Sequence, residues 1–308
     1  MRRRIRWTLA GATLAAVALT AGVLVAVGGR SATPVVASAP SAPPSPEDTA
    51  VSPVASTSAV PYPDLSSVAS DVAAAVTAAS RGTSVGFVLY DRESGKELAS
   101  LDAGRQYYTA SVVKLLIAID EVHDDTTGAW ALPDADAVAD LTDMLEGSDD
   151  AIASELWERN GGNAIVTRTA ALIGLTQTIP PADPTQWGMA KTTAADVVTT
   201  YQYLLDTVPD EVSAPLLAAL GNARNPADDG WDQYFGIPDG LPGRTFQIKQ
   251  GWMILRNALV LNTTGVVGGR YVVVLLTQQP LVSSAAGRAA VTAGITTLAP
   301  LLTRLDAA

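Results

Sequence analysis

The sequence lacks cysteine altogether and has one histidine among its 308 residues. Without cysteine the chain has no disulfide bond, no thiolate nucleophile, no cysteine-based metal site and no lipidated-cysteine anchor. The one histidine, His123, is followed by Asp124 and Asp125, but no Gly-x-Ser-x-Gly motif accompanies it. The sequence therefore argues against a Ser-His-Asp hydrolase of that type, and we interpret His123 as a surface residue.

Lysine is also scarce, because the chain has 16 arginines but only four lysines, Lys96, Lys114, Lys191 and Lys249. Lys114 interrupts an otherwise apolar run from Val112 to Ile119, and this run predicts a buried helix. Two interpretations of Lys114 are open. Either the apolar part of the side chain extends to the protein surface so that the ammonium reaches water, or burial lowers the pKa of Lys114 far enough for the amine to act as a base.

Positive charge is in short supply as a whole. The formal net charge is −11, and residues 64–308 hold 15 basic and 29 acidic residues, a net −14. A chain of this sign is a poor partner for nucleic acid, so we expect no such partner. The acidic runs match no metal-binding loop and are typical of solvated helix faces. We expect neither a metal site nor a cofactor.

The first 63 residues differ in composition from the rest. Residues 1–6 include four arginines, and the segment from Trp7 to Val27 contains no charged residue. This pattern predicts an export signal or membrane anchor over residues 1–30, and its length favours an uncleaved anchor. Residues 31–63 are rich in Pro, Ser and Ala, which predicts a linker. We expect an exported, extracytoplasmic protein of a bacterial envelope, membrane-anchored or secreted, and a monomer.

Residues 64–308 are predicted to form one α/β (α+β) domain. Period-two patterns predict strands and period-3.6 patterns predict helices. The expected strands lie at 83–90, 97–101, 245–252, 258–266 and 271–278, and the expected helices at 65–79, from about 111, within 133–160 as a pair, at 192–205 and at 282–305. Residues 161–190 read as loop-rich. The order predicts an antiparallel sheet of about five strands flanked by N- and C-terminal helices, with an all-helical insertion. The sheet lobe would comprise 64–105 and 244–308, and the helical lobe 106–243.

Three short motifs carry candidate chemistry. Ser111 and Lys114 are three residues apart, so they share one face of the predicted helix, and a serine beside a desolvated lysine is an activated nucleophile. Ser148-Asp149-Asp150 follows 37 residues after Ser111, at the break between the two acidic helices. Lys249-Gln250-Gly251 lies 138 residues after Ser111, on a predicted strand.

In order and spacing these motifs resemble those of the penicillin-binding proteins and class A β-lactamases, which are Ser-x-x-Lys, Ser-Asp-Asn and Lys-Thr-Gly. The resemblance covers about residues 64–305. It implies that Ser111 forms an acyl-enzyme, that Lys114 takes its proton and that Ser148 relays a proton to the leaving nitrogen. It also implies that Lys249 keeps these groups poised and attracts a substrate carboxylate.

The same resemblance implies the residues that meet the substrate, which would be Asp150, Gln250, Gly251 and Trp252. Backbone N–H groups of Ser111 and Trp252 would form the oxyanion hole. The expected partner is a β-lactam or a peptidoglycan stem peptide.

Departures from the family pattern affect the expected chemistry. Asp150 replaces an asparagine, so an amide becomes an acceptor-only carboxylate, and Gln250 replaces a threonine. Between Arg159 and Asp210 there is no glutamate to activate water, and Asp183 is a short substitute. The first hypothesis is therefore a serine hydrolase or acyltransferase that deacylates slowly. The alternative is a non-catalytic, membrane-tethered module that binds cell-wall peptide or a protein partner.

Overall fold

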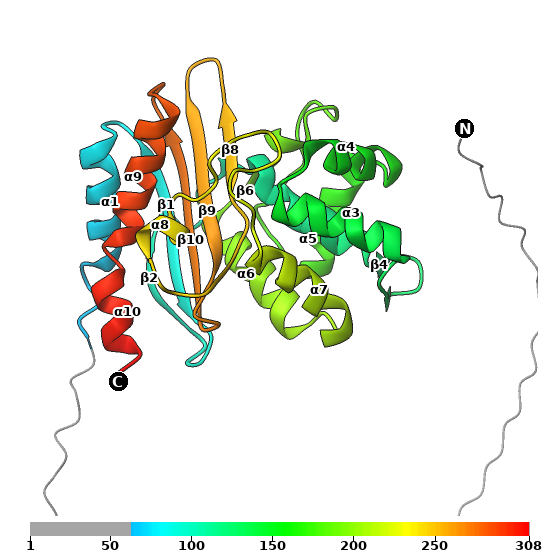
Figure 1. The fold of residues 1–308 in the computed structure, drawn as a ribbon, viewed down its shortest axis with the longest axis horizontal. Coiled ribbons are helices and arrows are strands. Elements are labelled where there is room, and N and C mark those ends of the chain that lie inside the picture. The colour runs from blue at the N-terminus through cyan, green and yellow to red at the C-terminus, as the bar shows by residue number, and fades with distance from the viewer. Residues whose placement is uncertain (1–62, 308) are drawn as a thin grey trace, which may run out of the picture. The chain divides into compact units, whose positions relative to one another are not determined.

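The computed structural model describes residues 63–307. The predicted anchor, 1–30, and nearly all of the predicted linker, 31–63, lie outside the described residues. In the described part, a helix and strands come first, a long and mainly helical section follows, and further strands and helices end the chain (Figure 1).

The sheet at the centre of the fold is antiparallel. Its strands are β1 (Ser84–Asp91), β2 (Lys96–Leu101), β7 (Phe246–Ile248), β8 (Gly251–Ile254), β9 (Leu259–Val267) and β10 (Tyr271–Gln279). The order across the sheet is β2-β1-β10-β9-β7, and β8 also pairs with β9, further along the same strand. β1 pairs with β10 along its whole length, from Ser84 opposite Gln278 to Asp91 opposite Tyr271. The early strand pair thus joins the late strands through β10, as the discontinuous pattern predicts.

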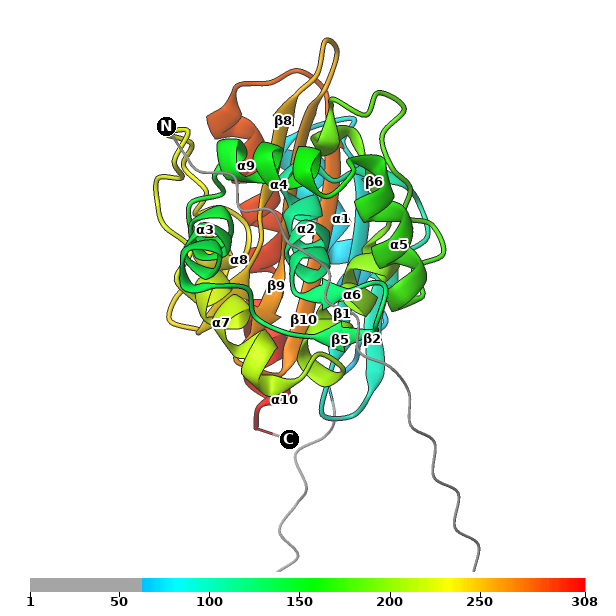
Figure 2. The same cartoon turned by 90° about the vertical axis from the view of Figure 1, so that its right-hand side faces the viewer.

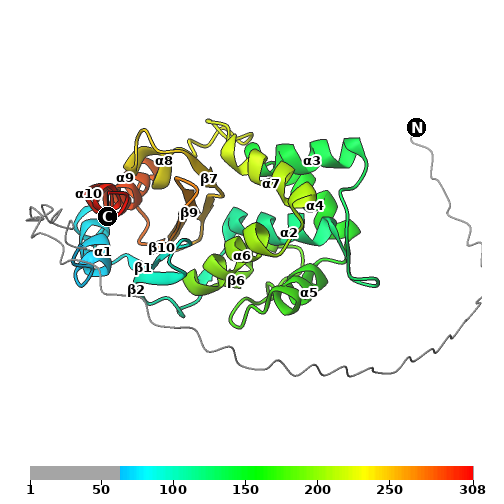
Figure 3. The same cartoon turned by 90° about the horizontal axis from the view of Figure 1, so that it is seen from below.

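One face of the sheet is covered by helices from both ends of the described chain, α1 (Val68–Ala79), α9 (Ser284–Thr296) and α10 (Ala299–Leu305) (Figure 1, Figure 3). α1 and α9 cross closely at Gly294, where a Cβ atom would lie 2.6 Å from Val76. Among the described residues, Ser284–Leu305 is the one helical stretch long and apolar enough to cross a membrane by length and composition. The single helix predicted over 282–305 is wrong in one respect, because it breaks between α9 and α10.

The other face packs against the helical section. The elements of this helical section are η1 (Ala110–Val113), α2 (Lys114–Glu121), α3 (Ala135–Glu146), α4 (Asp150–Arg159), α5 (Asn163–Ile173), η2 (Trp187–Met189), α6 (Ala194–Asp206) and α7 (Asp210–Gly221). The short helix α8 (Ile237–Gly240) lies apart from them, against α9. α2 is buried from Lys114 to Asp120, and Figure 2 shows it with α3 and α5 on either side. The prediction that 161–190 is loop-rich is wrong for α5, which lies between Gly162 and Gly174, both at positive φ.

Two short strand pairs complete the fold. β3 (Tyr107–Tyr108) pairs with β6 (Lys191–Thr192), and β4 (His123–Asp124) pairs with β5 (Ala129–Trp130). The imidazole of His123 packs 4.6 Å from the Trp130 ring, centroid to centroid, in a partly exposed position. The division into lobes at 105/106 and 243/244 stays a prediction. α8 falls in the predicted helical lobe, yet it packs against α9.

Candidate active site

Ser111 is held at the start of the central helix by two neighbouring elements. β3 leads directly into η1. Asn262 of β9 donates hydrogen bonds from Nδ2 to the backbone oxygens of Tyr108 (2.9 Å) and Thr109 (3.1 Å). Ala110, directly before the serine, has φ of +44°, a conformation that costs a non-glycine residue about 1–2 kcal/mol. Strain of this kind persists where the surroundings fix the backbone, and it clusters at functional sites.

Lys114 is fully buried, and its ammonium lies among oxygen atoms. Nζ is 3.2 Å from Ser111 Oγ, 2.6 Å from the Ser148 carbonyl oxygen and 2.6 Å from Asp150 Oδ1, with Ser148 Oγ also at 3.2 Å. An ammonium has three protons, so these four oxygens exceed its donors. The two contacts at 2.6 Å are the strong ones. The longer contact to Ser111 leaves the serine free to donate to a neutral amine.

Two opposing effects act on the pKa of Lys114. Burial lowers it, and the Asp150 carboxylate raises it, with burial the larger effect. The indole of Trp187 lies 4.9 Å from Nζ and adds a cation–π contact. Of the two interpretations open from the sequence, the ammonium that reaches water is wrong, because Lys114 has 0% exposure.

Ser148 stands at the turn between α3 and α4 with φ of +56°. A neighbouring loop holds this turn in place. Arg224 N–H donates to the Glu146 carbonyl oxygen, and its guanidinium bonds the Asp143 and Asp228 carboxylates. This network holds the end of α3 and so positions Ser148 beside Lys114 and Lys249.

Lys249 is the second buried lysine of the site. Its side chain is 1% exposed, and Nζ donates to Ser148 Oγ at 2.9 Å. Burial, together with the charge of Lys114, holds the pKa of Lys249 well below its usual range. Because Lys249 is buried, the amine does not reach the solvent directly, and the attraction of a substrate carboxylate by its charge stays a prediction.

Gln250 also differs from its expected role. Its side chain is 0% exposed, and Nε2 donates to the backbone oxygens of Gln233 (3.2 Å) and Phe235 (2.6 Å). The side chain thus points away from Ser111 and ties the strand to the 223–235 loop. The substrate contact predicted for Gln250 is wrong for this reason. At the same point the single strand predicted over 245–252 divides into β7 and β8.

Gly251 and Trp252 continue β8 past the nucleophile. A Cβ atom on Gly251 would lie 2.6 Å from the Thr109 carbonyl oxygen, so only glycine lets β8 pass this close to η1. Trp252 stacks on Trp231, with centroids 5.8 Å apart and an interplanar angle of 4°. Its Nε1 donates to Asp229 Oδ2 at 2.9 Å.

A cavity of about 290 Å³ opens over Ser111. It is lined by residues of α4, of the η2 loop and of β8. Lys114, Lys249 and Gln250 do not line it. Its lining residues are Ala110, Ser111, Asp150, Ser154, Thr185, Gln186, Trp187, Gly188, Met189, Trp252 and Met253.

Asp183 faces a different space. Its carboxylate accepts hydrogen bonds from the Thr185 N–H (2.9 Å) and hydroxyl (2.7 Å), and these bonds hold its pKa below the usual range. It lines a separate hollow of about 490 Å³ together with Lys191 and Tyr108. Asp196 is buried and accepts a hydrogen bond from the Thr178 hydroxyl. It therefore holds in place the segment between α5 and α6. In the described chain, Asp150 is the carboxylate that lines the Ser111 cavity.

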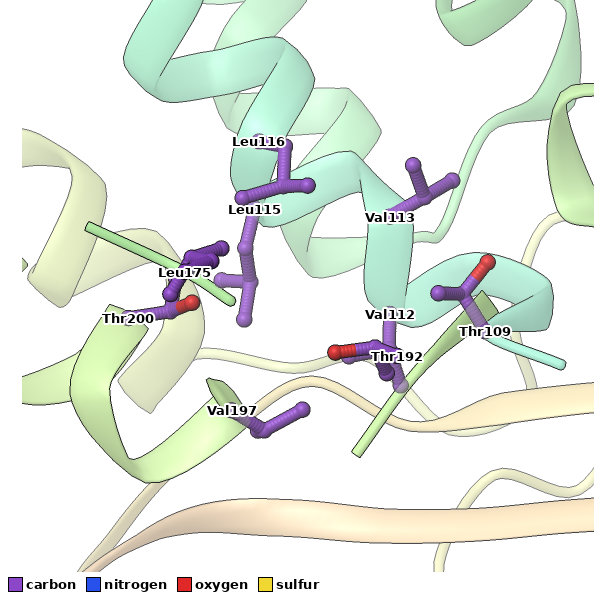
Figure 4. A pocket seen from close by; sticks show the side chains of 9 residues that line it. All are labelled: Thr109, Val112, Val113, Leu115, Leu116, Leu175, Thr192, Val197 and Thr200. Atoms are coloured by element: carbon purple, nitrogen blue, oxygen red, sulfur yellow. The ribbon is translucent and has the colours of Figure 1, made fainter. Parts of the chain in front are cut away.

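The back of η1 and α2 is apolar. Val112 and Leu115 face Leu175 and Val197 across a gap of about 10 Å³ (Figure 4). A gap of this size holds at most about one water molecule. It is therefore a packing defect beneath the nucleophile and no ligand site.

Comparison with known proteins identifies the family. No family model matches the chain. Curated proteins of Mycobacterium tuberculosis and Mycobacterium bovis, each described as "Putative lipoprotein LppW", are 36% identical over 229 residues, which cover 72% of this chain and 72% of theirs. The chain belongs to the LppW family.

Solved structures show the fold of this LppW-family chain. A β-lactamase from Desulfarculus baarsii has a TM-score of 0.59 at 20% identity, covering 78% of this chain and 98% of that one. The Streptomyces albus G β-lactamase has 0.60 at 19% identity, covering 76% and 98%. A mutant of PBP-A, solved as an acyl-enzyme complex with penicillin G, has 0.60 at 16% identity, covering 79% and 99%. The predicted fold class is confirmed, because the chain has the fold of class A β-lactamases and of PBP-A.

Three features of this LppW-family site were not predicted from the sequence. The Lys114–Asp150 ion pair joins two motifs, and its signal was the aspartate in place of the expected asparagine. Trp187 begins η2, within the segment 161–190 that was predicted to be loop-rich. Arg224 lies in the loop that supports Ser148, and nothing in its sequence context marks it.

Proposed function

We propose that the protein is an envelope serine hydrolase or acyltransferase that forms an acyl-enzyme on Ser111. The observation that supports this most directly is the 3.2 Å contact between Ser111 Oγ and Lys114 Nζ at the floor of an open cavity. A general base has to lie within about 2.6–3.2 Å of the proton that it takes. The β-lactam and D-Ala-D-Ala type of acyl donor is the starting point, because the fold neighbours are β-lactamases and PBP-A.

The proposed reaction uses the buried polar chain as a proton path. Ser111 Oγ attacks the carbonyl carbon while Lys114 Nζ takes the hydroxyl proton. As the tetrahedral intermediate collapses, the bond from carbon to the leaving atom breaks. Ser148 Oγ, bonded to both lysines, passes a proton to the leaving atom. Lys114 then passes the proton that it took from Ser111 to Ser148 through their 3.2 Å contact, while Lys249, 2.9 Å from Ser148 Oγ, holds that hydroxyl in position.

The oxyanion hole is proposed from the backbone. Ser111 and Trp252 both line the cavity, and their backbone N–H groups would bind the oxygen of the carbonyl group under attack. Removal of one such donor typically costs about 10²–10³ in kcat. The close approach of β8 to η1 at Gly251 sets the distance between the two N–H groups.

Slow deacylation is part of the proposal. Water needs a base to attack the acyl-enzyme, and such help contributes typically 10²–10⁴-fold. Asp150, the carboxylate in the cavity, is engaged by Lys114 at 2.6 Å. Asp183 faces Thr185 instead. A long-lived adduct follows.

We place the protein in the bacterial envelope, held by its N-terminal segment. The LppW relatives are described as lipoproteins, and this sequence has no cysteine to carry a lipid. The charge-free run from Trp7 to Val27 would provide the anchor in place of a lipid.

A second candidate function is supported by the ion pair. With Asp150 2.6 Å from its ammonium, Lys114 is stabilised in the protonated form, which cannot take a proton from Ser111. A site fixed in that state binds without reacting, as a membrane-tethered module for cell-wall peptide or a protein partner.

A neutral fluorophosphonate separates the two functions, because it labels activated serines irreversibly and carries no charge. We expect one adduct on the wild type, mapped to the peptide that contains Ser111, and none on Ser111→Ala. If the folded wild type stays unlabelled over a pH range of 6 to about 10, within which a perturbed lysine titrates, the non-catalytic function is supported instead.

A further inference from the structure

Among the described residues, the lining of the cavity over Ser111 includes a carboxylate and no cation. Asp150 is its one charged lining residue in the described chain, and the Asp150 side chain is 62% exposed. The exposed Asp229 carboxylate is bonded to Trp252. The field of Asp229 reaches both buried lysines, where it opposes the lowering of their pKa by burial.

The groups that could pair with a substrate carboxylate point elsewhere. Lys249 is 1% exposed and donates to Ser148, and the Gln250 amide is bonded to two backbone oxygens. Lys114 has 0% exposure and already pairs with Asp150. An anionic ligand would lose its water shell beside the Asp150 carboxylate, with the Asp229 carboxylate bonded to Trp252 nearby, and would gain no cation in return. Like-charge contacts of this kind are strongly unfavourable.

The aromatic lining fits the opposite kind of ligand. Trp187 and Trp252 both line the cavity, together with Met189 and Met253. Indole faces attract cations and apolar groups alike. Carboxylates beside indoles are a suitable surrounding for an uncharged or cationic group.

We infer that the site selects acyl donors that lack a free carboxylate next to the scissile bond. This inference rests on the proposed function. It assigns the donor to peptide-like amides or esters whose end is blocked, amidated or continued, and it makes Asp150 and Asp229 specificity-determining residues. Donors with a terminal carboxylate, penicillins among them, react poorly.

Three thioesters test this inference. They share a phenylacetyl group and differ in the leaving thiol, which is thioglycolate (anionic), 2-mercaptoethanol (neutral) or thiocholine (cationic). In each case the C–S bond breaks, Ser111 Oγ bonds to the carbonyl carbon, and the serine proton ends on the departing thiol. Because all three leave the same phenylacetyl adduct, differences in the adduct formation rate report on the leaving thiol, and the part that is due to its charge is the part that changes with salt and with the aspartate variants.

We expect the cationic and neutral thioesters to acylate the full-length protein roughly tenfold faster than the anionic one, the effect of about one screened like-charge contact. The difference in acylation rate between the three thioesters should become smaller in Asp150→Asn or in Asp229→Asn, whichever carboxylate faces the leaving thiol. It should stay unchanged in Asp140→Asn. Asp140 is exposed on α3 and serves as the matched control. Raising NaCl from about 20 mM to about 500 mM should also narrow it, because the Debye length falls several-fold.

The failure of this inference differs from that of the proposed function. If the fluorophosphonate labels Ser111 but the anionic thioester reacts as fast as the others, the selectivity is refuted and the hydrolase stands. A spread that persists in both variants and at high salt likewise refutes the role of the two carboxylates. If neither the fluorophosphonate nor any thioester modifies Ser111, the proposed function itself fails.

Discussion

Replacing Asp150 by asparagine removes a charge from the candidate base while keeping an acceptor oxygen in place. The Asp150 carboxylate lies 2.6 Å from Lys114 Nζ. At the dielectric constant of water, a unit charge pair at that distance interacts by about 1.6 kcal/mol. The high value of the dielectric constant is appropriate because Asp150 is 62% exposed. The ion pair therefore favours the protonated amine by about 1.6 kcal/mol, a little more than a factor of ten in the protonation equilibrium.

The sign of the effect follows from the role of the amine. The carboxylate raises the pKa of Lys114 against the larger effect of burial, so its removal lowers that pKa further. The base is then available at lower pH. At pH values where the wild-type amine is mostly protonated, acylation by the neutral thioester should be roughly tenfold faster in Asp150→Asn, and the pH–rate profile should move toward lower pH.

Time-resolved intact-mass measurements over a pH series provide the assay. Asp140→Asn is the matched control and should follow the wild type. A profile that stays in place, or that moves toward higher pH, would refute the idea that Lys114 is the base and that Asp150 restrains it. Thermal unfolding of each variant shows whether the domain is intact.

The remaining predictions concern the same site. Lys114→Arg keeps the charge but cannot give up its proton, so acylation should fall by at least about 100-fold; an Arg variant that reacts at the wild-type rate would exclude the base role. Gly251→Ala places a Cβ atom 2.6 Å from the Thr109 carbonyl oxygen, so we expect slower acylation and about 1–3 kcal/mol less stability in chemical denaturation. Gly104→Ala, with no neighbouring atom within 4 Å, should change neither. The acyl-enzyme should persist for minutes, and Asp183→Asn should leave its lifetime unchanged; a lifetime that lengthens about 100-fold would identify Asp183 as the deacylation base.

The sequence was sufficient to predict which side chains meet, but not how they pair. Ser111 and Lys114 lie at a helix start and Ser148 at a turn, as their motifs predict, whereas Lys249 lies in the break between β7 and β8 and not on the predicted strand. The fold brings the four side chains within hydrogen-bond distance of one another. The direction of Gln250 depends on backbone oxygens supplied by the 223–235 loop. No local pattern encodes such a tertiary contact.

The missed elements have local explanations. α5 was hidden by the glycines before it and the prolines after it, although Ile165, Val166, Thr169, Ala170 and Ile173 have helical spacing and are buried. The break between β7 and β8 follows from the inward turn of Gln250, which a period-two pattern cannot show. The pairing of Asp150 with Lys114 could have been expected only from the distance between two motifs in space.

Acylation of Ser111 by the neutral thioester is the most direct test of the central claim. The wild type should gain one phenylacetyl group, mapped by peptide mass to the segment that contains Ser111, and neither Ser111→Ala nor Lys114→Arg should gain it. A folded wild type that gains no phenylacetyl group at any pH between 6 and about 10, where a buried lysine titrates, would contradict the account. So would an adduct that forms equally well on Ser111→Ala.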